Sequence, residues 1–139
     1  MCIFACGTYT TVAIKPHKCH KVMVWCKEGK LKPIHYDDDG RMYDVGDTMI
    51  PNLHIDVNEL DMRPKIEAGV IYAYDDSVYA STMFDLYRSC FRFKDNTDRV
   101  CCLVECEIPR GAVYWKDRSG RELASTKLTI KRIIEKGGG

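Results

Sequence analysis

The sequence has no long hydrophobic run, almost no net charge and no internal repeat. A membrane-spanning helix needs about 20 consecutive apolar residues, and no stretch approaches that length, so we expect no membrane partner. The 21 basic and 20 acidic residues leave a formal net charge of +1, which gives the whole chain no electrostatic attraction to nucleic acid. The apolar start, residues 1–7, lacks a basic segment and is too short for a secretory signal. We therefore expect a cytoplasmic protein.

The 139 residues are 45% hydrophobic and 29% charged, which fits one globular domain. We predict an N-terminal lead-in over 1–16, a single α+β domain over 17–136 and a flexible glycine tail over 137–139.

The eight cysteines are expected to be reduced thiols that fill the core of a cytoplasmic protein. Their spacing does not favour a metal site. Cys102 and Cys106, for example, would lie ~13 Å apart along a strand and could not share an ion. His17 and Cys19 would face the same way on a strand, but they lack the further ligands of a zinc knuckle. We expect no metal and no cofactor.

Segments of alternating or β-branched residues predict a mostly antiparallel, curved sheet of about six to seven strands. Gly29 indicates a hairpin turn after the first long strand, and Pro33 marks the return strand as an edge or bulge. Residues 100–108 are apolar on both faces in their first half, which favours the centre of the sheet. After residues 113–116 and a polar turn, residues 123–134 are predicted to form the last strand.

One helix is predicted over about residues 76–91. Asp75, Asp76 and Ser77 precede it as candidate N-caps. Its apolar positions fall on one stripe and are expected to face the sheet; they are Tyr79, Met83, Leu86, Tyr87 and Cys90.

Short motifs occur along the chain in a characteristic order. The front contains Met1-Cys2, "CHKV" at 19–22, "EGKL" at 28–31 and "YDVGD" at 43–47, and the end contains "EIPRGAVYW" at 107–115 and "ASTKLTI" at 124–130. This order resembles a family of small uncharacterised tailed-phage proteins, whose matching motifs are "CYKV", "DGKL", "YELGK", "EIPKGAKYY" and "ASDKIKI". The chain lacks the histidine and phenylalanine of that family's middle strand at 69–74. The resemblance implies a phage origin and a shared fold, but no established activity.

Residues 108–114, followed by Glu122, are similar to the C-terminal half of some ADP-ribosyltransferases. Those enzymes use a glutamate at a strand start to bind the nicotinamide ribose and stabilise an oxocarbenium-like transition state. The resemblance implies an enzyme acting on NAD with Glu122 as its catalytic carboxylate. Such enzymes also need a Ser/Thr strand motif and an early Arg or His. Only Ser81-Thr82 and Ser125-Thr126 are available for the motif, and Ser81-Thr82 falls on the predicted helix. The alternative is that Glu122 is a solvated charge in a hairpin.

Aromatic and basic side chains gather near the predicted strand ends. Such rings and cations suit a pocket for a nucleotide or another phosphate-bearing ligand. The candidate ligand-binding residues are Tyr72, Tyr74, Arg88, Arg110, Trp115 and Lys127. Aromatic rings also suit strands and cores, and we expect at least half of them to be core residues.

Three functions remain open from the sequence. The first is a small phage-encoded binding protein without a catalytic residue, which counters a host defence by sequestering a nucleotide-derived signal or by inhibiting a host defence protein. The second is an ADP-ribosyltransferase-like enzyme. The third is a structural or morphogenetic phage protein. An oligomer is compatible with each of them.

Overall fold

The computed structural model describes residues 10–26, 28–34, 42–50, 71–90 and 99–137, which form nine strands and one helix. The elements are β1 (Thr10–Val12), β2 (His17–Cys26), β3 (Leu31–Pro33), β4 (Thr48–Met49), β5 (Ile71–Tyr74), α1 (Ser77–Cys90), β6 (Arg99–Ile108), β7 (Val113–Lys116), β8 (Glu122–Ser125) and β9 (Leu128–Lys136). The strands form one sheet of order β1-β7-β8-β5-β2-β6-β9-β4, with β3 paired to β2. All pairs are antiparallel. The predicted α+β class is confirmed, with more strands than expected.

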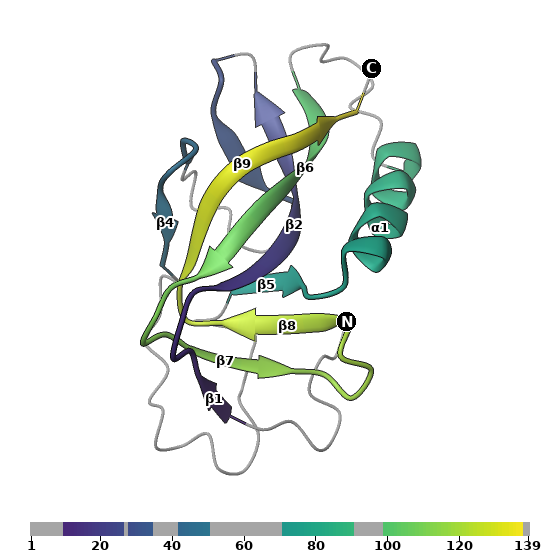
Figure 1. The fold of residues 1–139 in the computed structure, drawn as a ribbon. Coiled ribbons are helices and arrows are strands. Elements are labelled where there is room, and N and C mark those ends of the chain that lie inside the picture. Colours follow the sequence, from purple (N-terminus) through teal and green to yellow (C-terminus); the bar gives the residue numbers. More distant parts are fainter. Residues whose placement is uncertain (1–9, 27, 35–41, 51–70, 91–98, 138–139) are drawn as a thin grey trace.

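The sheet bends between β2 and β5, so that β5, β8 and β7 run across the direction of β2, β6 and β9 (Figure 1). One end of the sheet therefore gathers the start of β2, the end of β6, the start of β7 and the β8–β9 connection (Figure 1). The candidate site lies at this end.

The central pair, β2 and β6, is in register over ten residues. Alternate residues of β6, including Cys102, Val104 and Ile108, are fully buried in the larger core cluster. Cys101 and Leu103 point to the other face and pack in the cluster that α1 covers. Both faces of the first half of β6 are therefore buried, as the sequence predicts.

The helix begins at Ser77 because Asp76 caps it. Oδ1 of Asp76 accepts the main-chain N–H groups of Val78 at 2.8 Å and Tyr79 at 3.3 Å, as an N-cap side chain does. Of the three N-cap candidates, Asp76 is the one that caps.

The side of α1 that meets the sheet is centred on Ala80 and Phe84, which are at most 1% exposed. Tyr79, Met83 and Tyr87 pack beside them, as predicted. Leu86 is 52% exposed, so the prediction that it faces the sheet is wrong. It lies two residues after Phe84, and about 100° of rotation per residue turns it away. Within the described residues, no helix is long and apolar enough to cross a membrane.

The prediction of one strand over 123–134 is wrong, because the chain turns at residues 126–127. Oγ of Ser125 donates to the C=O of Lys127 at 2.6 Å and accepts its N–H at 3.2 Å. This local turn separates β8, which pairs with β5 and β7, from β9, which pairs with β6 and β4.

Two strands of two or three residues, β1 and β4, complete the sheet and are too short to show an alternating pattern. Since β1 pairs with β7, part of the predicted lead-in belongs to the sheet. Residues 1–9 of that lead-in and residues 138–139 of the predicted tail lie outside the described residues.

Candidate functional site

Three turns at one end of the sheet carry basic side chains that have no partner among the described residues. Lys15 lies on the β1–β2 turn, Arg110 on the β6–β7 turn and Lys127 on the β8–β9 turn, and we call these three residues the basic end. All three are exposed. None of the three side chains forms an ion pair or a hydrogen bond with another described residue. The sequence predicts Arg110 and Lys127 as ligand-binding residues, and the fold places them together.

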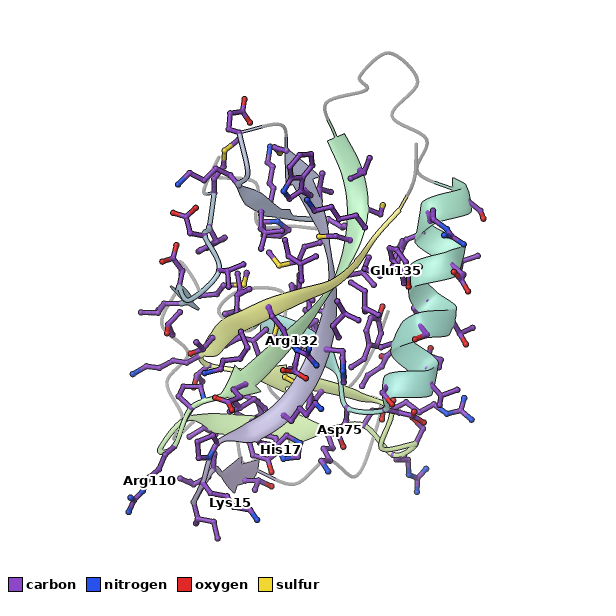
Figure 2. All side chains as sticks on the ribbon, turned by 45° about the horizontal axis from the view of Figure 1, so that its top comes forward. Lys15, His17, Asp75, Arg110, Arg132 and Glu135 are labelled. Carbon is purple, nitrogen blue, oxygen red and sulfur yellow. The ribbon has the colours of Figure 1, made fainter. Side chains whose placement is uncertain are left out.

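Main-chain hydrogen bonds hold these turns side by side. The main chain of Ala13 exchanges hydrogen bonds of 2.7 and 2.9 Å with the β6–β7 turn. The N–H of Thr126 donates to the C=O of Val113 at 3.0 Å, which ties the β8–β9 turn to the start of β7. Figure 2 shows the side chains of Lys15 and Arg110 pointing away from the sheet at this end. The relative positions of the three turns are therefore fixed by the backbone.

The three turns that carry the basic end contain no acidic residue. Residues 13–16, 109–112 and 126–127 include no aspartate or glutamate. Ile14, next to Lys15, is 84% exposed, and Val12 is 55% exposed. An apolar side chain thus stands beside unpaired cations on the same surface.

Immediately after the β1–β2 turn, His17 connects three strands. Its Nε2 lies 2.6 Å from Oδ1 of Asp75, the residue that follows β5. Nζ of Lys116, on β7, lies 2.9 Å from Oδ2 of the same carboxylate. The imidazole stacks on Tyr114 with ring centroids 5.2 Å apart and an interplanar angle of 20°. We call these four residues the His17 cluster; Figure 2 shows His17 and Asp75 close together.

Asp75 supplies the carboxylate of the His17 cluster. Burial alone would raise the pKa of Asp75, but the hydrogen bonds and positive charges of Lys116 and His17 outweigh burial and lower that pKa. Because this carboxylate can only accept, His17 donates its Nε2–H to it.

A carboxylate behind a histidine can support general-base catalysis. However, no hydroxyl or thiol of a described residue is hydrogen-bonded to the other ring nitrogen of His17. Among the described residues, the cluster therefore holds no activated nucleophile. What it does is join β2, β5 and β7 and fix the residue that follows the β1–β2 turn.

Glu122 lies at the start of β8 on the face that α1 covers. It is 5% exposed, and its Oε1 accepts a hydrogen bond from the hydroxyl of Tyr79 at 3.3 Å. Burial raises the pKa of Glu122, and the nearby carboxylate of Asp117 adds to this effect. Arg121 extends over the ring of Tyr79, with its guanidinium carbon 5.4 Å from the ring centroid. The interpretation of Glu122 as a solvated hairpin charge is therefore wrong.

The aromatic candidates are mainly part of the packing. Trp115 is 1% exposed and Tyr74 is 8% exposed. Tyr72 is half-buried on β5, and its C=O accepts a hydrogen bond from Lys21 at 2.6 Å. Trp115 and Tyr72 lie in one row of the sheet, because both pair with Ala124.

Arg88 lies away from the other basic candidates. It packs beside Gly137, after the last residue of β9, whereas Lys127 precedes the first. Its guanidinium pairs with Asp85 at 3.0 Å. The six predicted ligand-binding residues are therefore divided over the structure: Arg110 and Lys127 lie on neighbouring turns, the aromatic residues pack in the sheet, and Arg88 lies on α1.

The described cysteine side chains are buried free thiols; they are Cys19, Cys26, Cys101, Cys102 and Cys106. Burial raises the pKa of Cys102 and of Cys106 to about 12 and the pKa of Cys19 well above its usual value. Among the described residues, no three His, Cys, Asp or Glu side chains gather as metal ligands would.

Because the thiolate is the reactive form of cysteine, we expect Cys19, Cys102 and Cys106 to resist alkylation in the folded protein. Iodoacetamide at pH 8 should modify each of them at least ~100-fold more slowly than in the denatured chain, since both burial and protonation oppose the reaction. Mass spectrometry of the digested protein over time measures each rate separately. Labelling of any of the three at the denatured rate would contradict their placement in the core.

No pattern in the sequence singles out Lys15 or Ile14. His17 is predicted only as a possible metal ligand, and Asp75 only as an N-cap. Asp75 is 58 residues from His17 along the chain, and no local pattern signals such a contact. The exposed Ile14 beside Lys15 and Pro16 was the available clue, because an apolar residue in a turn has no core to join.

No protein-family model matches this chain, and no curated protein or solved structure matches it.

Proposed function

We propose that this chain acts by binding a partner protein and does not turn over a substrate. The observation that carries the proposal is the distribution of its reactive and charged groups. The described thiols and Glu122 are buried. In contrast, three basic side chains at one end of the sheet are exposed and pair with no other described residue. Chemistry needs its reactive groups within reach of a substrate, but binding needs charge and apolar surface on the outside.

The resemblance to small tailed-phage proteins supplies the biological setting of the proposal. The chain would be phage-encoded and act in the cytoplasm of an infected bacterium, where it inhibits a host defence protein by occupying its surface. Sequestering a nucleotide-derived signal has less support, because Trp115 and Tyr74 are buried and Arg88 lies away from Arg110.

The test is purification of the tagged chain from a bacterial host at low ionic strength. We expect a host protein to co-purify in a fixed ratio and to stay bound during gel filtration. If no host protein does so and the chain is found in purified virions, the structural or morphogenetic function replaces this proposal.

The ADP-ribosyltransferase-like alternative makes a separate prediction for Glu122. The purified protein is expected to consume no labelled NAD⁺, since the carboxylate that would act on it is buried against Tyr79. Consumption of NAD⁺ that Glu122→Gln abolishes would establish the enzyme and contradict the binding proposal.

The same substitution has an expected effect on stability. The folded-state pKa of Glu122 is raised, so its stabilising contribution is complete below the unfolded pKa and is lost as the pH rises through the folded pKa. Urea unfolding of Glu122→Gln should therefore show stability that increases relative to wild type from about pH 4 to pH 8.

A further inference from the structure

We propose that the basic end and Ile14 form the docking surface, and that its partner is an acidic protein surface with an apolar contact point. The proposal rests on the proposed function, that the chain binds a protein, and adds which surface binds and what chemistry it meets.

Other lysines near this end of the sheet are paired with carboxylates. Near the basic end, Lys18 pairs with Glu105 at 3.1 Å and Lys131 pairs with Glu107 at 3.5 Å. The side chains of the basic end have no such carboxylate among the residues that the structure describes, although the chain as a whole is nearly neutral. Their local positive potential is complementary to carboxylates on another molecule.

Ile14, next to Lys15 on the β1–β2 turn, adds an exposed apolar side chain to this surface. Ile14 is 84% exposed, and its burial in a complex would remove apolar surface from water. An apolar contact with a charged rim is the usual anatomy of a protein–protein interface. The basic side chains favour an acidic partner, and the exposed Ile14 favours one that also offers an apolar contact.

The surface is held in place before it binds. The β1–β2 turn, which carries Ile14 and Lys15, is hydrogen-bonded to the β6–β7 turn through Ala13. Its following residue, His17, is held by Asp75 and by the ring of Tyr114. A surface that is ordered in the free protein loses less conformational entropy on binding.

The same features favour a protein over a membrane or a nucleic acid. Stable attachment to an anionic bilayer takes a larger basic cluster or a lipid anchor in addition to a few cations. Single-stranded nucleic acid is bound by stacking on exposed rings, but Tyr114 and Trp115 at this end are 9% and 1% exposed.

The test measures binding of defined probes by fluorescence anisotropy at low ionic strength. The probes are a labelled peptide of glutamate and leucine, a matched peptide of lysine and leucine, a labelled oligonucleotide and phosphatidylserine vesicles. The variants are Ile14→Ser, Arg110→Glu and the triple Lys15→Glu/Arg110→Glu/Lys127→Glu. The matched control is Arg118→Glu, an exposed arginine on the β7–β8 turn at the other end of β7. All four variants should keep the wild-type thermal transition, because the altered side chains are exposed.

We expect the acidic peptide to bind the wild type and Arg118→Glu with the same affinity within about threefold. Arg110→Glu should weaken its binding about tenfold and the triple variant at least about 100-fold, because like charges then face each other. Ile14→Ser should weaken it about tenfold through lost apolar contact. Preferential binding to the oligonucleotide or the vesicles, equal binding by Arg110→Glu and Arg118→Glu, or no peptide binding would each overturn the proposal.

The co-purified host protein separates this proposal from the proposed function. If it binds the triple variant as tightly as the wild type, the docking surface is wrong but the binding function stands. If no host protein binds the wild type, the proposed function itself fails.

Discussion

Replacing Trp115 with alanine is expected to lower the free energy of unfolding by about 4 kcal/mol, because it removes the largest fully buried side chain of the described residues. Trp115 sits on β7 between Thr10 of β1 and Ala124 of β8, and alanine would leave a cavity there. The loss is a large fraction of the stability of an ordinary domain. Urea unfolding followed by circular dichroism measures it.

Val78→Ala is the control for the Trp115 prediction. Val78 is 74% exposed on α1, so its truncation should change the unfolding free energy by less than about 0.5 kcal/mol. A loss below about 1 kcal/mol for Trp115→Ala would show that the ring is accessible, and would return it to the set of candidate ligand-binding residues.

Replacing Asp75 with asparagine is expected to lower the free energy of unfolding by about 2 kcal/mol at pH 7, because two charge-assisted contacts are lost together. Lys116 and His17 would both lose their anionic partner at 2.9 and 2.6 Å. The effect is moderated by solvent, since the side chain of Lys116 is 43% exposed and exposed pairs are screened.

The pH dependence gives the Asp75 prediction its sign. The folded-state pKa of Asp75 is lowered, so its stabilisation is complete above the unfolded pKa of about 3.9 and is lost as the pH falls through the folded value. The difference between wild type and Asp75→Asn should therefore shrink below about pH 4. The control is Asp85→Asn, because the side chain of Asp85 is 65% exposed. It should lower the free energy of unfolding by less than about 0.5 kcal/mol at any pH. A pH-independent loss at Asp75 would indicate a packing effect in place of the ion pair.

The local features of the fold can be predicted from the sequence. The apolar residues on both faces of the first half of 100–108 correctly predict a strand buried on both sides there, and the acidic residues before Ser77 correctly predict the start of the helix. Gly29 has a φ of 81° in the β2–β3 hairpin, as its predicted turn requires. These features depend on residues within a few positions of one another.

The features that were not predicted depend on contacts between distant segments. The split of 123–134 at residues 126–127 follows from a turn around Ser125, but both flanking strands are apolar and read as one. Leu86 fits the apolar stripe of the helix, and only the position of the sheet decides that Phe84 is buried instead. The His17 cluster and the basic end form only when β1, β5 and β7 come together.

At this end of the sheet, some side chains hold the strands together and others are exposed on the turns. The apolar and ionisable groups that face the sheet, such as Trp115 and Asp75, are used in holding strands together. The groups on the turns, such as Arg110 and Ile14, have no partner among the described residues. We therefore expect the first set to stabilise the fold and the second set to contact the partner.

The central claim is that recognition occurs through the basic end, and calorimetric titration of the co-purified host protein tests it most directly. Arg110→Glu and Arg118→Glu make the same chemical change at opposite ends of β7. The account predicts that Arg110→Glu raises the dissociation constant at least about tenfold, while Arg118→Glu leaves it within about threefold of wild type. Equal dissociation constants for the two variants would contradict it.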